Sequence, residues 1–163
     1  PPRGGDGRPL PALSELAQMR GDAARGARVF RGEQAACIKC HRVGDEGVEF
    51  GPSLSQIGGK LARQALYESI LDPSAGISFG YEGWAIGLKS GDEVFGLLAS
   101  ETEEELAVRQ QSGAVVRIPR SQIAGREMQR LSVMPSGLGQ ILSLEELVDL
   151  VEYLAGLRAP DTK

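Results

Sequence analysis

The chain has 163 residues, a length typical of one domain or of one domain with an insertion. Its composition, 41% hydrophobic and 25% charged, is that of a folded globular protein rather than a disordered one. With a net charge of −4 it lacks the basic footprint of a nucleic-acid-binding domain, so we expect no nucleic-acid partner. No apolar run is long enough for a transmembrane segment. The chain begins with two prolines rather than Met, which fits either a removed targeting segment or a domain taken from a longer protein.

The first half of the chain is predicted to be helical with loops between the helices. Residues 1–13 are rich in Pro, Gly and Arg without periodicity and are predicted to form a linker. Asp22 is placed to cap a helix over residues 23–30. Residues 42–60 are rich in glycine and are predicted to be a loop. Residues 62–72 form an amphipathic pattern, and this helix should end there because a proline follows.

The second half of the chain changes from a β pattern to a helical one. Residues 81–119 alternate between apolar and polar side chains with short turn signals between the runs, which predicts an antiparallel β unit of about four strands. Strands this short need a packed face, so we expect a small curled sheet or barrel. Ser143 and Glu146 fit a capping box for a last helix with a wide apolar stripe. Gly156 and Pro160 mark the expected end of that helix.

Both cysteines and the single histidine lie together in the motif Cys37-Ile38-Lys39-Cys40-His41. Two cysteines three residues apart on a helical turn present both sulfurs on one side, where each can reach one vinyl group of a porphyrin. A histidine directly after the second cysteine can then place its ring over the iron. Because C-x-x-C-H is the attachment signature of c-type haem, the sequence predicts one haem c held by Cys37 and Cys40, with His41 as an iron ligand. The carbonyl of Pro52 is a candidate acceptor for the second ring nitrogen of His41.

Two other uses of these residues are less well supported. A thioredoxin-like C-x-x-C follows a strand in a βαβ unit, whereas a helix precedes this motif and no parallel sheet is indicated. A structural zinc site needs four nitrogen or sulfur ligands, and this cluster supplies three. We therefore favour haem over thiol redox chemistry and over zinc.

The sixth iron ligand is predicted to be Met134, since the chain has no second histidine. Pro135 keeps Met134 out of the helical region, so its long side chain can extend from an irregular loop. Met128 lies among charged residues and Met19 precedes the motif, so both are weaker candidates, and Met134 could also be core filler. Histidine–methionine ligation leaves no site for a substrate and is typical of electron transfer.

These motifs together resemble class I c-type cytochromes. Gly26 and Phe30 look like the family's crossing residues on the first helix, and Leu150 with Tyr153 looks like their counterpart on the last helix. The segment Gly51-Pro52-Ser53-Leu54 and the following Ile57-Gly58-Gly59-Lys60 look like the loop after the haem motif, and residues 134–138 look like the distal ligand loop.

The resemblance implies roles for further residues and a domain organisation. It implies Pro52 as the acceptor for His41, Leu54 and Ile57 as walls of the haem pocket, and Lys60 near a haem propionate. The implied fold is a mainly α cytochrome c fold with an inserted β unit. Its parts are an extension or linker (1–21), the first part of the cytochrome core (22–80), the inserted β unit (81–130), the distal loop and last helix (131–158), and a tail (159–163).

The inserted β unit also resembles that of the haem-binding module at the C-terminal end of large exported dehydrogenase-like proteins of planctomycetes and verrucomicrobia. In that module, too, a β insertion separates an Asp-Pro motif, here Asp72-Pro73, from the Met-Pro motif. The resemblance implies an electron carrier rather than an enzyme, a relay attached to, or derived from, a larger redox protein in the periplasm or outside the cell. Its donor would be a dehydrogenase, and its acceptor a cytochrome or an oxidase.

Two other functions stay open at this stage. The β insertion could strain the Met134 loop and leave the sixth position open, as in a sensor or binder of CO or NO. Alternatively, the β unit could serve mainly as an interaction surface, including one that forms a homodimer.

Overall fold

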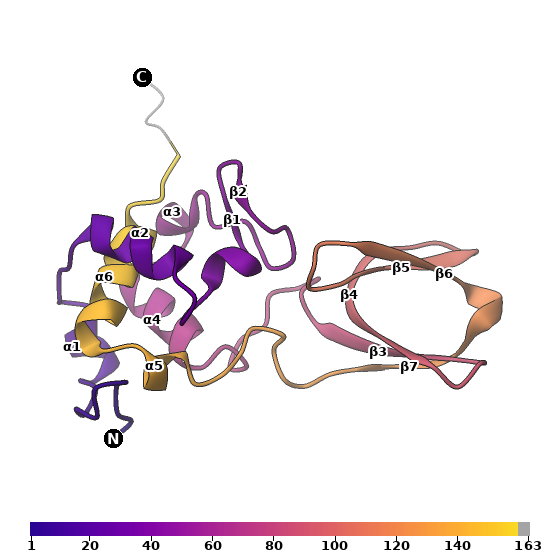
Figure 1. Cartoon of the computed structure of the whole chain (residues 1–163), viewed down its shortest axis with the longest axis horizontal. Coiled ribbons are helices and arrows are strands. Elements are labelled where there is room, and N and C mark those ends of the chain that lie inside the picture. Colours follow the sequence, from indigo (N-terminus) through magenta and orange to yellow (C-terminus); the bar gives the residue numbers. More distant parts are fainter. Residues whose placement is uncertain (160–163) are drawn as a thin grey trace.

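The computed structural model describes residues 1–159, which form two parts joined by two connectors (Figure 1). One part, the helical body, comprises residues 1–72 and 134–159; the other, the β unit, comprises residues 83–128. The predicted helix stop at Pro160 lies outside the described residues, as does the predicted tail beyond residue 159. Within residues 1–159, no helix is long and apolar enough to cross a bilayer.

Short helices make up most of the helical body. Its elements are α1 (Leu13–Leu16), α2 (Ala23–Arg31), the 3-10 turn η1 (Cys37–Lys39), the hairpin strands β1 (Arg42–Val43) and β2 (Glu46–Gly47), α3 (Ile57–Lys60), α4 (Arg63–Leu71), α5 (Leu138–Ile141) and α6 (Leu144–Ala155). The caps read from the sequence are confirmed: Asp22 accepts a hydrogen bond from the backbone N–H of Arg25, and Ser143 and Glu146 form a capping box.

The crossing of α2 and α6 organises the helical body. A Cβ atom added at Gly26 would lie 1.9 Å from the backbone oxygen of Asp149, so only glycine lets the two backbones come this close. One turn further along α2, the Phe30 ring packs edge-on against Tyr153, with ring centroids 5.6 Å apart. The resemblance assigns this crossing role to Gly26, Phe30, Leu150 and Tyr153. The structure brings Gly26, Phe30 and Tyr153 together and buries Leu150 in the same core as Phe30.

The N-terminal segment that was predicted to be a linker packs against the helical body instead. Leu10 is only 6% exposed, and the N–H of Gly5 donates to the Leu142 carbonyl at 2.7 Å. Arg8 also pairs with Glu145 at the start of α6. The prediction relied on composition, which cannot show that a Pro- and Gly-rich segment finds partners elsewhere in the chain.

The β unit is a single antiparallel sheet of five strands in the order β6-β5-β4-β3-β7. The strands are β3 (Gly83–Leu88), β4 (Glu93–Glu101), β5 (Glu105–Arg109), β6 (Val115–Pro119) and β7 (Ile123–Met128), with a 3-10 turn, η2 (Arg120–Gln122), between the last two. Strand β4 pairs with β3 through residues 93–97 and with β5 through residues 97–101, and the β4–β5 pairing contains a register shift between Leu98 and Ser100. The enclosed side chains form a small separate core of Ile86, Leu106, Val108 and Ile118.

Two predictions about fold class need correction. The sheet has five strands rather than about four. The prediction missed β7 because this strand is exposed along almost its whole length and shows no apolar alternation. The chain is also not clearly mainly α, since the five-stranded sheet accounts for a large part of it beside the short helices.

Replacing Asp149 with asparagine is expected to lower the stability of the helical body and flatten its acid dependence. Asp149 is 6% exposed; its carboxylate accepts from the N–H of Asp22 at 2.8 Å and from Arg25 Nε at 2.8 Å. Burial alone would raise the pKa of Asp149, but these two donors outweigh it and hold the pKa below its ordinary value.

This carboxylate therefore stabilises the fold above the unfolded-state pKa, and its contribution is lost as the pH falls through the lower folded-state pKa. We expect Asp149→Asn to cost about 2 kcal/mol at pH 7 and less below pH ~4. Urea unfolding of both proteins at several pH values measures the difference. A loss that is equal at all pH values would contradict this role for the charge.

Candidate haem-attachment site

The motif residues lie on one compact turn. Cys37 begins η1, and the backbone N–H groups of Cys40 and His41 both donate to the Cys37 carbonyl, at 3.1 and 2.9 Å. Ala36, just before the turn, adopts φ +51°, the one positive φ at a non-glycine residue within the described range. A left-handed alanine costs about 1 kcal/mol, so the surrounding structure holds this turn in place.

His41 has one ring nitrogen engaged and one left for a ligand. Its Nδ1 lies 2.7 Å from the Pro52 carbonyl, the contact expected from the sequence, and the carbonyl requires Nδ1 to be the N–H donor. The lone pair of Nε2 is then available, as in metal-binding histidines whose other nitrogen is fixed by an acceptor. Burial lowers the pKa of His41 below its ordinary value, and this effect is larger than the opposite effect of the hydrogen bond to Pro52. The ring is therefore neutral at pH 7.

Gly51 is a site residue that the sequence analysis missed. A Cβ atom added there would lie 2.7 Å from Cε1 and 3.0 Å from Nδ1 of His41, so any side chain would push the ring away. Its backbone N–H also donates to the Cys40 carbonyl at 2.6 Å, which ties the loop to the motif. In the sequence Gly51 appears only within the segment that resembles the loop after the haem motif, and its contact with the His41 ring follows from the fold.

The Cys37 thiol is unsuited to redox exchange of its own. Both cysteines are free, and burial raises the pKa of Cys37 to about 11. A thiol of such high pKa is protonated at neutral pH and is a poor nucleophile, unlike the activated thiols of disulfide oxidoreductases. The environment of Cys37 therefore argues against the thioredoxin-like alternative.

Several partly exposed apolar side chains pack against the core of the helical body. They include Leu54 and Ile57, which the resemblance assigns to the pocket walls, and also Cys37, Ile38, Val43 and Met134. A porphyrin needs such apolar surface on both faces. Lys60, by contrast, is exposed at the end of α3, and its place beside a propionate stays a prediction.

A buried donor beside the motif also fits a haem group. Nε of Arg42 is buried and has no hydrogen-bond partner among residues 1–159. Buried donors normally have a partner, and a propionate carboxylate is an acceptor of the required charge. Sequence analysis did not single out Arg42, because one arginine after the motif forms no pattern. A covalently held haem fits three features of this site: the cysteine and histidine ligands of the motif, the partly exposed apolar side chains, and the unpartnered N–H of Arg42.

The segment that carries Met134 is held by side-chain hydrogen bonds. Met134 N–H donates to Ser132 Oγ at 3.1 Å, and Ser132 N–H donates to Ser74 Oγ at 2.9 Å. Of the other methionines, Met128 is 53% exposed on β7, and Met19 packs against the core after α1. Met134 packs against the core of the helical body, so it is better placed than the exposed Met128 to be an iron ligand. The role of Met134 stays a prediction.

Comparison with known proteins gives a match to a family model over part of the chain. Residues 23–86 match the family described as Cytochrome c, a stretch that contains α2, the cysteine–histidine motif, α3 and α4 and ends within β3, before Met134. No curated protein matches the chain. The family implies a covalently attached haem c, which the spacing of Cys37, Cys40 and His41 fits. The match therefore supports a c-type cytochrome, an electron-carrier module that works by haem-based electron transfer with redox partners.

Proposed function

We propose that this chain is a monohaem c-type cytochrome domain that passes one electron at a time between redox proteins. The observation that carries the proposal is the arrangement at the motif. Two thiols lie on one turn beside an imidazole whose Nδ1 is engaged by the Pro52 carbonyl at 2.7 Å. That arrangement offers two covalent anchors and one oriented nitrogen ligand within five consecutive residues.

Each residue has a separate role in this proposal. Cys37 and Cys40 would each hold the haem through a thioether; adding a thiol S–H across a vinyl double bond would need no oxidant. His41 supplies Nε2 to the iron, and Pro52 keeps the ring in the required tautomer. Met134 would supply a thioether as the second protein ligand, which would favour the reduced iron relative to two imidazoles. When bound, the haem iron supplies a couple that gains and loses a single electron.

The contacts around Met134 support electron transfer over ligand sensing. Ser132 and Ser74 fix the backbone directly before Met134, which favours a methionine that stays in place rather than one that gives way. A filled sixth position leaves no room for CO or NO, and it lets the iron change oxidation state with little atomic movement.

Redox titration of the matured protein tests the proposed function. We expect one reversible one-electron step and no fast binding of CO to the ferrous protein at neutral pH, because His41 and Met134 would both ligate the iron. Rapid, tight CO binding would instead favour the sensor. A protein that fails to show a one-electron step would contradict both functions.

The wider context of this function is also part of the proposal. The resemblance to the module of exported dehydrogenase-like proteins supports a relay that takes electrons from a dehydrogenase and delivers them to a cytochrome or oxidase. Haem attachment to C-x-x-C-H normally takes place outside the cytoplasm, which supports a periplasmic or exported location. The edge strands β6 and β7 offer a surface for a homodimer, which the solution mass of the intact chain would test.

A further inference from the structure

We propose that the turn between β5 and β6, residues 110–113, covers the Cys40 side of the haem site and selects which electron donors and acceptors reach it. We call residues 110–113 the edge turn. The proposal rests on the proposed function, since it concerns access to a haem held at Cys40. The proposal gives the inserted β unit a role in electron transfer. The cytochrome c match ends within β3 and therefore assigns no role to the rest of the β unit.

The edge turn touches the motif directly. The side-chain amide of Gln111 reaches within 3.9 Å of Cys40 Sγ, although 71 residues separate the two in sequence. Next to it, a Cβ atom added at Gly113 would lie 3.2 Å from Cγ1 of Val48, so the turn also packs against the loop after the motif. In Figure 1 the loop between β5 and β6 faces the helical body, while η2 lies at the opposite end of the β unit.

Backbone hydrogen bonds fix the conformation of the edge turn. The N–H of Gln110 donates to the Ala114 carbonyl at 2.8 Å, and the N–H of Gly113 donates to the Gln110 carbonyl at 2.8 Å. Gly113 adopts φ +89°, a conformation that glycine takes at little cost. The edge turn is therefore a defined structure on a packed sheet rather than a loose loop.

The β unit contacts the other side of the site as well. Gly83 at the start of β3 lies between the Phe95 ring and Val133, because a Cβ atom added at Gly83 would be 3.0 Å from each. Val133 directly precedes Met134, the predicted distal ligand. The β unit thus contacts the motif at Cys40 through the edge turn, and through Gly83 it contacts Val133, the connector residue directly before Met134.

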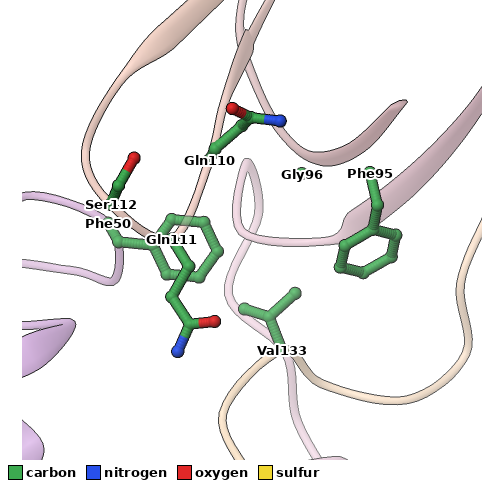
Figure 2. A pocket seen from close by; sticks show the side chains of 7 residues that line it. All are labelled: Phe50, Phe95, Gly96, Gln110, Gln111, Ser112 and Val133. Atoms are coloured by element: carbon green, nitrogen blue, oxygen red, sulfur yellow. The ribbon is translucent and has the colours of Figure 1, made fainter. Parts of the chain in front are cut away.

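A cleft of about 370 Å³ lies between these two contacts (Figure 2). Phe50 comes from the helical body, Gln110, Gln111 and Ser112 from the edge turn, and Phe95 and Val133 from the opposite side. The lining has aromatic rings, amides and a hydroxyl but no charged side chain. A cleft of this size admits a small molecule, whereas the surface of another protein cannot enter it.

The physical consequence is selection by size. A donor or acceptor exchanges electrons fastest when it approaches the porphyrin edge closely, and the edge turn occupies the approach on the Cys40 side. It also displaces water from that side, which lowers the local dielectric and favours the less charged, reduced iron. Opening the cover should therefore speed exchange with small reagents and lower the reduction potential.

The test uses the full chain, matured with haem, in four forms. Gln111→Ala removes the side chain nearest Cys40 and should open the cover, whereas Ser112→Trp should fill the cleft. Gln122→Ala on η2 is the matched control, since it makes the same chemical change on an exposed residue at the far end of the β unit. The fourth form is the unaltered chain.

Two measurements are made on each form. One is the rate of reduction by hexaammineruthenium(II), corrected for driving force with the measured potential. We expect a severalfold higher rate and a lower potential for Gln111→Ala, a severalfold lower rate for Ser112→Trp, and no change for Gln122→Ala. The other is hydrogen exchange at the amides of residues 110–114, which should be slower in haem-loaded protein than in protein without haem.

The outcomes separate this inference from the proposed function. If intact mass shows no attached haem in the unaltered chain, the proposed function and the cover both fail. If haem is attached but the rates with Gln111→Ala and Ser112→Trp equal that of the unaltered chain, only the cover is overturned. Equal changes in the Gln122→Ala control would also overturn it, because the effect would then not depend on the cleft.

Discussion

Replacing Gly26 with alanine is expected to destabilise the helical body, although the same change on an exposed helix would stabilise it. Alanine is about 1 kcal/mol better than glycine within a helix. At Gly26, however, the added Cβ would lie 1.9 Å from the Asp149 carbonyl oxygen and 2.8 Å from Tyr153 Cβ. Because backbone atoms cannot move aside cheaply, α2 and α6 must separate, and we expect a net loss of about 3 kcal/mol.

Gly59→Ala is the matched control for this experiment. Gly59 lies in α3, where an added Cβ would meet nothing within 4 Å. Urea unfolding should show no loss of stability for Gly59→Ala and a clearly lower midpoint for Gly26→Ala. If both substitutions behaved alike, the close crossing of α2 and α6 would not be the feature that requires glycine at position 26.

Replacing Met134 with alanine is expected to have the largest effect on the redox behaviour. Loss of the thioether should open the sixth position of the iron, abolish the ligand band of methionine, and lower the reduction potential by on the order of 100 mV. The ferrous variant should then bind CO rapidly. Absorption spectra in both oxidation states, a potentiometric titration and a CO titration measure these changes.

Met128→Ala serves as the comparison in the same experiment. Met128 is 53% exposed on β7, so its loss should alter neither the spectrum nor the potential. Unchanged ligand bands in Met134→Ala would remove Met134 from the distal role. In that case, the core position of Met19 makes it the next methionine to examine.

The features that could be predicted from the sequence are those that depend on neighbouring residues. The caps at Asp22 and Ser143 involve residues three positions apart, and the motif from Cys37 to His41 is itself contiguous. The crossing role of Gly26 came from resemblance, since a glycine within a helix shows only that something must approach closely. The contact between His41 and Pro52 came from the chemistry of the ring and the turn that follows.

The features that could not be predicted depend on contacts between distant segments. Strand β7 is defined by its pairing with β3, not by its own mostly exposed residues. Leu10 is buried beside Gly139 of α5, and Gly51 matters because its backbone passes the ring of His41. Contact of Gln111 with Cys40 likewise depends on how the β unit sits against the helical body.

Intact mass together with the absorption spectrum, measured on protein produced in a host that matures cytochromes, tests the central claim most directly. A chain heavier by one haem, with the addition localised to the peptide that contains Cys37 and Cys40 and with bands of a low-spin iron, is the predicted result. Unmodified thiols and no tetrapyrrole absorption in such a host would contradict the account.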